Sequence, residues 1–535
     1  MTAVFRNGRI FVPSTTPAQE SNDFADAMII TGDRISYVGS LDQVEIPAEA
    51  TVVDLNHRVV VPGFIDAHVH ILHYGHSLQK VDLIDCTSLD EIRATIKAYA
   101  EANPSVPRIF CRGWLQVTTN GVALASMLDD LDPRPIFIDA FDLHSMWCNS
   151  AALKAMGADT APDLPGGCIH RDENGRPSGL LDESAVMNMA WPYVESLHSR
   201  EDKLAALDKA ISAYSAAGYT GVVDMAMDEP TWEILNEYRR DKTIPFHVAA
   251  HWLVPYTENQ EANFKYVDRA VELRRQFQNP SFCVVGVKLI CDGVVDGCTA
   301  ALLQPYTGKK DLVEPIWPEH QLREVVQRAD AAGLQCAIHA IGDRAVHQAI
   351  NVLSQVGTPG RRHRIEHLEL TTSEDAKRLG ELGITASVQP VHSDPALFKA
   401  WHDLVGPDRC QRAFAYKDFL DGGAPMAFGT DAPTASNLPF PNLYNATTRR
   451  SALEPESTDT VNAQFSVTLA QATTAATAGA AYARFAESWT GRLQPGLSAD
   501  FVVVDTQWSA DKLLEAKVCQ TWYRGKKVFD VAHSA

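Results

Sequence analysis

The sequence has little of what marks disulfide-rich or nucleic-acid-binding proteins. It has only ten cysteines in 535 residues, and no two of them form a C-x-x-C pair. Neither a thiolate zinc site nor a thioredoxin-type redox motif is therefore indicated. Basic residues are also scarce, with 47 Lys and Arg against 67 Asp and Glu. This balance argues against a nucleic acid or an anionic membrane surface as partner, because phosphate contacts need basic patches.

Long apolar runs are missing as well. No segment reaches the roughly 18 apolar residues of a membrane helix, and the N-terminus, MTAVFRNGRIFVP, has no apolar signal core. With thiols that fit a reducing compartment, these absences lead us to expect a soluble cytoplasmic protein.

The composition that is present fits a globular protein with a large core. Hydrophobic residues make up 45% and charged residues 21% of the chain, which excludes a disordered polypeptide. Short β-strands with turn residues are expected over residues 1–60, including a hairpin turn at Asn7-Gly8, and over 485–535. We predict a small β-sandwich domain built from both of these ends, around a larger domain over 61–484.

The middle of the chain alternates apolar runs with helical stretches. Eight β/α units are what a closed (β/α)₈ barrel of the TIM type requires, so an α/β fold of this kind is predicted. The interval after the first run is too long for one crossover and predicts an inserted α/β subdomain at about 75–195, with a hairpin turn at Asn174-Gly175. The eight runs are VVVPGFIDAHVH (59–70), YTGVVDM (219–225), FHVAAHW (246–252), CVVGVKLI (283–290), LQCAIHA (334–340), RIEHLEL (364–370), ITASVQP (384–390) and MAFGTDA (426–432).

Residues of the metal-ligating type stand where several of these strands end. His68 and His70 close the first strand, and alternate residues of a strand face the same side. An H-x-H pair alone does not distinguish metal ligands from surface or core histidines. His339, His367 and Asp431 end the fifth, sixth and eighth strands, and strand ends of one polarity meet at the barrel mouth. This nitrogen and oxygen set predicts a divalent metal, zinc by default, with iron, manganese or cobalt as alternatives.

Lys288 lies inside the apolar fourth strand, GVKLI. A lysine buried there is costly as a cation unless it is paired or chemically altered. Two interpretations stay open at this point. Lys288 forms a salt bridge with a neighbouring acid such as Asp292, or its neutral amine takes up CO₂ and becomes a carbamate that bridges two cations.

Together the motifs resemble the metal-dependent amidohydrolase superfamily, in particular the YtcJ-like branch that includes N-substituted formamide deformylases. The resemblance covers nearly the whole chain, with one departure in DGVVDGCTAAL (292–302), where Asp296 and Cys298 replace the usual small or basic residues and affect substrate specificity. The matching motifs are PGFIDAHVH (62–70), DLHSMWCNSAAL (142–153), PGGCIHRDENGRPSGLL (165–181), GVKLICDG (286–293), HAIGDRAV (339–346), RIEHLEL (364–370), GTDAP (429–433) and PGLSADFVVVD (495–505).

The resemblance implies roles for the individual ligands. His68 and His70 bind a first metal together with Asp431, and His339 and His367 hold a second one. Lys288 bridges the two as a carbamate if the site is binuclear. The expected cofactor is thus one or two Zn²⁺ ions. A homodimer is the expected assembly, because dimers are common in the family.

The expected reaction is hydrolysis of a C–N bond in a small amide, formamide or N-acyl compound, with Asp431 as general base and acid. Lactone or cyclic-amide opening, deamination and non-oxidative decarboxylation on the same metals are alternatives, and a non-catalytic scaffold is a third.

Residues around the metals supply the candidates for substrate contacts. His144 is either a substrate-facing donor or a structural histidine. Trp114 and Trp147 are candidates for an apolar lid over the substrate, and Asp292 and Arg344 are further candidates for substrate binding, although Arg344 also fits a structural pair with the preceding Asp343.

Overall fold

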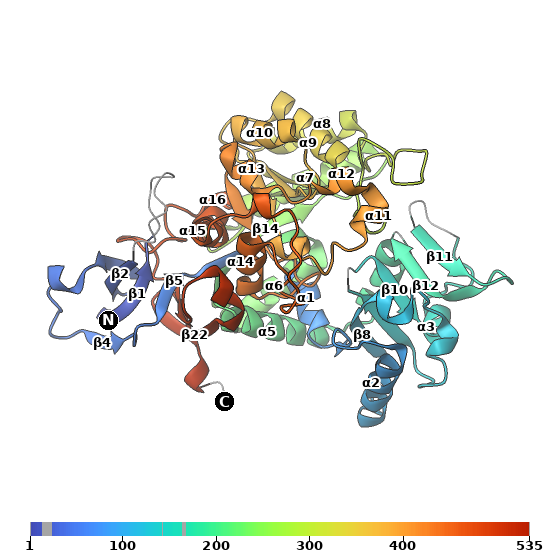
Figure 1. The fold of residues 1–535 in the computed structure, drawn as a ribbon, viewed down its shortest axis with the longest axis horizontal. Coiled ribbons are helices and arrows are strands. Elements are labelled where there is room, and N and C mark those ends of the chain that lie inside the picture. The colour runs from blue at the N-terminus through green and yellow to red at the C-terminus, as the bar shows by residue number, and fades with distance from the viewer. Residues whose placement is uncertain (1, 13–23, 142, 163–166, 184, 534–535) are drawn as a thin grey trace. The chain divides into compact units, whose positions relative to one another are not determined.

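The computed structural model describes residues 2–12, 24–141, 143–162, 167–183 and 185–533 (Figure 1). The chain divides into two compact units, one of Met1–Ile71 with Ile211–Ala535 and one of Leu72–Ala210. Among the described residues, no helix combines the length and the apolar character needed to cross a membrane.

The first unit contains the predicted barrel. Its strands are all parallel and neighbour one another in chain order, with the short antiparallel β15 (Gln278–Asn279) beside β16. A bridge between Val69 and Ala432 joins the two ends, where the Asp431 N–H donates to the His68 carbonyl at 2.8 Å. The TIM-barrel prediction is therefore confirmed. The strands are β6 (Phe64–Val69), β13 (Tyr219–Met227), β14 (His247–Leu253), β16 (Phe282–Ile290), β17 (Gln335–Ala340), β18 (Arg364–His367), β19 (Thr385–Val388) and β20 (Met426–Phe428).

Helices follow the barrel strands and begin at capping residues. Asp228 caps α6 by accepting the Thr231 N–H at 2.9 Å, and Asn259 and Thr372 cap α7 and α10 in the same way. The helices of this unit are α6 (Glu229–Asp241), α7 (Gln260–Gln276), α8 (Glu319–Ala331), α9 (Asp343–Val356), α10 (Ser373–Glu381), α11 (Trp401–Val405), α12 (Pro407–Cys410), α13 (Tyr416–Asp421), α14 (Pro439–Thr448), α15 (Leu469–Thr474) and α16 (Ala480–Ala483), while α5 (Arg200–Ala216) leads into it.

Strands from both ends of the chain share one eight-stranded sheet. Its central pair is β5 with β21, antiparallel, with Val60 opposite Val503. The two-layered sandwich stays a prediction, because hydrogen bonding joins these eight strands into a single sheet. The strands are β1 (Thr2–Phe11), β2 (Phe24–Thr31), β3 (Arg34–Gly39), β4 (Thr51–Asp54), β5 (Val59–Pro62), β21 (Phe501–Asp505), β22 (Lys517–Tyr523) and β23 (Lys526–Asp530).

Two sequence predictions at this end of the chain are wrong. The run 59–70 is not one strand but two, because β5 belongs to the terminal sheet and β6 to the barrel. The break falls at Gly63, where a Cβ atom would collide with Thr220. Asn7-Gly8 is not a hairpin turn either. Asn7 has a φ of +56° within the continuous strand β1, whose register with β2 shifts between Arg6 and Ile10. The pair Asn-Gly is favoured in irregular strand positions as well as in hairpin turns, which explains the wrong prediction.

The second unit, whose colour in Figure 1 runs from blue at α2 to cyan and teal at β10 and β11, holds its own six-stranded sheet. The predicted hairpin joins β11 and β12 and turns at Asn174-Gly175, where Gly175 has a φ of +75°. Residues 142, 165 and 166 of the motifs quoted above lie outside the described part of the chain. The strands are β7 (Val81–Asp82), β8 (Ile109–Trp114), β9 (Ile136–Ala140), β10 (Ser145–Cys148), β11 (Gly167–Arg171) and β12 (Pro177–Glu183), and the helices are α1 (Ile71–Ser77), α2 (Leu89–Ala102), α3 (Ser150–Ala155) and α4 (Trp191–Ser196).

A stacked pair of histidines makes this second unit sensitive to acid. The rings of His76 and His198 lie 3.9 Å apart at an interplanar angle of 18°. Burial lowers the pKa of His76 to about 2 and also lowers that of His198. Both rings are therefore neutral in the folded protein, and their charged neighbours Lys80 and Lys203 oppose protonation further.

We expect stability to fall as the pH drops below the ordinary histidine pKa of 6.5. Below that pH the unfolded chain binds a proton at His76, whereas the folded chain does not. At one pH unit below 6.5 this difference lowers the free energy of unfolding by about 1.4 kcal/mol. In urea unfolding, the loss of stability between pH 7.5 and 5.5 should be smaller by about that amount in His76→Leu than in the wild type. The exposed His320 offers the control His320→Leu, and equal pH dependence in all three proteins would contradict the prediction.

Candidate metal centre

His68 in β6 and His70, just after that strand, converge with Asp431 at the carboxyl end of the barrel. His68 Nε2 lies 3.3 Å and His70 Nε2 3.1 Å from Asp431 Oδ1. The other nitrogen of His68, Nδ1, contacts Glu366 Oε2 at 2.8 Å. Such a carboxylate fixes the orientation of a histidine ring and leaves the opposite nitrogen available as a ligand.

His367 and His339 complete the cluster from β18 and β17. The ring centroid of His367 is 5.0 Å from that of His68 and 4.3 Å from that of His339. Its Nδ1 is 4.0 Å from Asp431 Oδ2. Ligand atoms of His68, His367 and Asp431 all lie within 4.8 Å of one another, which is close enough for one ion. The structure thus brings together the five predicted His and Asp ligands.

Two of these ligands adopt a backbone conformation that side chains other than glycine rarely tolerate. His367 has a φ of +77° and Asp431 a φ of +58°. Such residues are held in place by their surroundings and gather at functional sites. Here they turn the ends of β18 and β20 so that both side chains face His68.

The electrostatics keep three of the imidazoles neutral and the carboxylate charged. Burial lowers the pKa of His68 to about 4 and that of His339 to about 3, and it also holds the pKa of His367 well below its usual range, while the Lys288 ammonium acts in the same direction. Burial alone would raise the pKa of Asp431, but the polar contact with His70 Nε2 at 3.1 Å helps to hold it well below its usual range. Neutral imidazole and ionised carboxylate are the forms that bind metals.

Two buried atoms show that this set fits a divalent cation. His367 Nδ1 is inaccessible to solvent and has no hydrogen-bond partner among the described residues, and buried Asp431 Oδ1 has none in good hydrogen-bond geometry, although two histidine nitrogens lie 3.1 and 3.3 Å from it. Buried polar atoms are nearly always satisfied, so an unmatched oxygen and nitrogen in one cluster indicate an ion. Nitrogen and oxygen ligands of this kind suit zinc and its first-row neighbours.

Lys288 points from β16 to the same centre. Its side chain is only 2% exposed, and burial lowers its pKa to about 8, against the opposing influence of Glu366 and Asp431. It forms no ion pair with any residue that the structure describes. The Asp292 carboxylate instead accepts backbone N–H groups of Ala301, Ile341 and Gly342 at 2.8–3.0 Å. The salt bridge between Lys288 and Asp292, which was the alternative interpretation to a carbamate, is therefore not formed.

Asp292 and Arg344 have structural contacts rather than a free face for a substrate. Asp292 ties the segments after β16 and β17 together and lies 3.6 Å from His339 Nε2, so it positions that histidine. Burial raises the pKa of Asp292 to about 7. Arg344 pairs with Glu314 at 2.6 Å and 2.9 Å. The predicted Asp343–Arg344 pair is replaced by this contact, and Asp343 accepts the Leu303 N–H.

The remaining predicted site residues belong to the second unit. Trp114 and Trp147 are 1% and 0% exposed, with ring centroids 5.3 Å apart. They pack in an apolar core of that unit, and the Trp147 indole donates to the Leu124 carbonyl. Both indoles are therefore core residues of that unit, and a lid role for them stays a prediction. His144 contacts Glu183 at 3.0 Å and is 18% exposed, and its role as a donor stays a prediction.

Several residues of the centre were missed by the sequence analysis. Glu366 lies two residues after Arg364, which contacts it through Nε at 2.5 Å, and strand alternation could have found this pair. His392 follows β19, where no ligand was expected. Its ring is parallel to that of His367 at 6.0 Å, and its nitrogens lie 3.2 Å from Glu369 and 4.0 Å from Asp431. Although burial opposes it, these carboxylates raise the pKa of His392.

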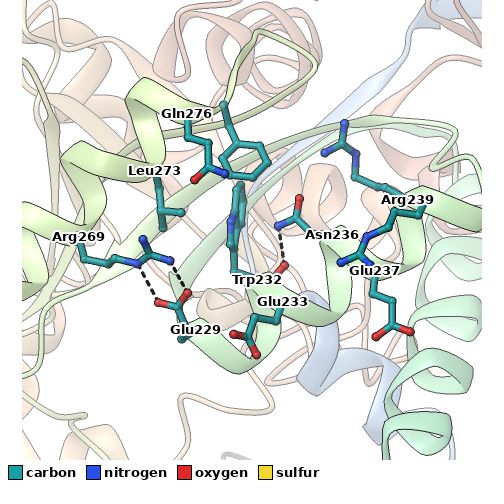
Figure 2. Close-up of a pocket in the computed structure, with 11 residues that line it drawn as sticks. Glu229, Trp232, Glu233, Asn236, Glu237, Arg239, Arg269, Leu273 and Gln276 are labelled. Atoms are coloured by element: carbon teal, nitrogen blue, oxygen red, sulfur yellow. Dashed lines mark hydrogen bonds and ion pairs between the residues drawn. The ribbon is translucent and has the colours of Figure 1, made fainter.

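Away from the metal centre, a hollow lies on the outer surface between α6 and α7 (Figure 2). Its volume is about 710 Å³, and Arg269 crosses it to pair with Glu229. It shares no residue with the metal centre, and its acidic and basic side chains offer no imidazole, so we assign it no part in the chemistry.

The barrel and the ligand set at its carboxyl end are typical of a metal-dependent barrel enzyme, because the active sites of such barrels lie at that end. The Amidohydrolase family matches residues 51–529. The chain therefore belongs to the amidohydrolase family.

Individual relatives confirm the predicted resemblance to the YtcJ-like branch. The chain is 30% identical over 547 residues to protein LONG AFTER FAR-RED 3 of Arabidopsis thaliana, covering 98% of this chain and 91% of that one. It is 28% identical over 519 residues to YtcJ of Bacillus subtilis (strain 168), an amidohydrolase by name, with 94% of both chains covered. It is 25% identical over 544 residues to N-substituted formamide deformylase of Arthrobacter pascens, covering 94% and 95%.

A solved structure shows the same fold. The crystal structure of an uncharacterized metal-dependent hydrolase from Pyrococcus horikoshii OT3 superposes with a TM-score of 0.75 at 24% identity. The match covers 95% of this chain and 98% of that one.

Proposed function

We propose that the protein hydrolyses the C–N bond of a small amide, such as an N-substituted formamide or another N-acyl compound. The observation that carries this proposal is the cluster of His68, His339 and His367 with Asp431 at the carboxyl end of the barrel. The similarity to the formamide deformylase supports the substrate class. We expect zinc as the metal, one or two ions per chain, in a cytoplasmic homodimer.

We assign the residues of the centre the following roles. His68, His70, His339, His367 and Asp431 would hold the metal, and Lys288 would add a bridging carbamate. When bound, a divalent metal supplies an activated water at neutral pH and polarises a carbonyl.

Proton transfer falls to Asp431. Its neighbours keep it ionised, so it can accept a proton from the attacking water at a carboxylate oxygen and return it to the leaving nitrogen. Glu366 holds the His68 ring in position for this step, and His144 is our candidate for a donor to the substrate carbonyl.

Product analysis tests the proposal. Protein supplied with zinc should convert formanilide and acetanilide to aniline with formate or acetate, and a chelator should stop the reaction. Ammonia or CO₂ as product, from a wider panel, would instead support deamination or decarboxylation. No turnover of any amide by protein that contains metal would contradict the proposal.

A further inference from the structure

Gln389 is a buried amide without partners at the carboxyl end of β19. It follows directly on Val388, the last residue of that strand, and is only 2% exposed. Neither its Oε1 nor its Nε2 has a hydrogen-bond partner within the described part of the chain. A buried primary amide that leaves its acceptor and its donor unpaired is costly, and such groups call for an explanation.

Strand alternation places Gln389 on the same side of its chain segment as Ser387, whose partners support the metal centre. Ser387, two residues earlier, faces the barrel interior, where its Oγ accepts a hydrogen bond from Arg364 at 2.5 Å. Arg364 in turn holds Glu366, the residue that orients His68. Alternate residues share one face, so Gln389 lies on the interior side one step closer to the barrel mouth.

Hydrogen bonds hold the backbone of Gln389, whereas its side chain makes none with the described residues. Its carbonyl accepts the His392 N–H at 2.9 Å and the Tyr416 hydroxyl at 3.5 Å. The turn so formed places His392 beside Asp431. The backbone that carries the amide is thus fixed beside His392, while both hydrogen-bonding functions of the amide remain without a partner among the described residues.

Another buried glutamine of the barrel shows how this protein satisfies such a group when the role is structural. Gln335, at the start of β17, is 0% exposed. Its Oε1 contacts His251 Nε2 at 2.8 Å, and its Nε2 donates to the carbonyls of Ala483, at 3.0 Å, and Arg362. The unmatched amide at position 389 therefore contrasts with a fully matched one at the opposite end of the barrel.

We propose that Gln389 binds the amide group of the substrate and selects for its N–H. This inference rests on the proposed function and narrows it to secondary amides, whose nitrogen carries one hydrogen. Oε1 of Gln389 accepts that N–H, and Nε2 donates to an oxygen of the substrate. An ester or an N,N-disubstituted amide lacks the donor and leaves Oε1 buried and unpaired in the complex.

Such a site rejects analogues that lack the hydrogen-bonding group much more strongly than an apolar pocket rejects a lost methylene. We therefore expect the wild type to prefer each secondary amide over its N-methyl counterpart by at least about 10-fold in kcat/KM. The probes are formanilide with N-methylformanilide, and acetanilide with N-methylacetanilide.

Gln389→Met keeps the length of the side chain and removes both polar atoms. It should reduce the preference for the N–H compound to about threefold or less, mainly by weakening the turnover of the secondary amide. Its melting temperature should be equal to or higher than that of the wild type, because no partner in the protein is lost. Gln389→Asn, which withdraws the amide by one methylene, should reduce the preference as well.

Gln335→Met is the matched control. It should lower the melting temperature, because it leaves His251 and two buried carbonyls unpaired, but it should leave the preference for the N–H compound intact. Wild-type turnover without a preference, or an unchanged preference in Gln389→Met, would overturn the assignment while the hydrolase function stands. A marked fall in the melting temperature of Gln389→Met would also overturn it. If the wild type turns over none of the amides, the proposed function fails, and this inference fails with it.

Discussion

Asp431→Asn should lower kcat/KM for an amide substrate by at least about 1000-fold. The substitution keeps the size of the side chain but removes the negative charge that lies 3.3 Å from His68 and 3.1 Å from His70. The variant thereby loses an anionic ligand and the proton acceptor at once. Steady-state kinetics together with metal analysis by mass spectrometry measure the two losses separately.

The control for this variant is Asp421→Asn. Asp421 is an exposed aspartate whose contact with Lys417 lies on the surface of α13, so its replacement should leave activity and metal content unchanged. Activity of Asp431→Asn within about 10-fold of the wild type, with metal still bound, would contradict the role of Asp431 as the proton acceptor.

Lys288→Ala should lower kcat/KM by at least about 100-fold and reduce the metal content from two ions to one or none. A pKa of about 8 leaves much of the amine neutral near pH 8. The neutral Nζ can then bond to the carbon of CO₂ and release one proton, which yields an anionic carbamate. Protein equilibrated with ¹³C-bicarbonate should show a carbamate signal by NMR in the wild type only.

A short carboxylate such as acetate should restore part of the activity of Lys288→Ala, because it can occupy the space of the missing carbamate. The matched control is Lys417→Ala, which removes an exposed lysine and should change none of these readouts. Two bound metals and full activity in Lys288→Ala would show that Lys288 is a neighbour of the centre and not a bridge.

The barrel and its principal ligands could be predicted because both leave local marks in the sequence. Each barrel strand is a short apolar run, and His68, His339, His367 and Asp431 follow such runs at the end where barrel sites lie. The break at Gly63 was missed although Pro62-Gly63 is a turn signal, because the runs on both sides are equally apolar and together predict one strand. Only the terminal sheet, which pairs β5 with β21, separates them.

The predictions that are hardest to make from sequence concern partners that lie far away in the chain. Nothing near Trp114 or Trp147 distinguishes a core indole from one that lines a site, since Trp114 packs against Trp147 and the Trp147 indole donates to the Leu124 carbonyl, 23 residues earlier. His392 and Gln389 were missed because the seventh strand carries no ligand of its own. Their importance appears only when β19 is placed beside β18 and β20.

The pairing of β5 with β21 also has a consequence for the order of events during synthesis. β5 leads through Gly63 alone into β6, the strand that contains His68, yet its partner consists of Phe501–Asp505. The ribosome must therefore synthesise more than 400 further residues before these two strands can pair, and contacts of such long range form slowly. The first strand of the metal centre thus gains its neighbouring support only after all the predicted ligand residues have been synthesised.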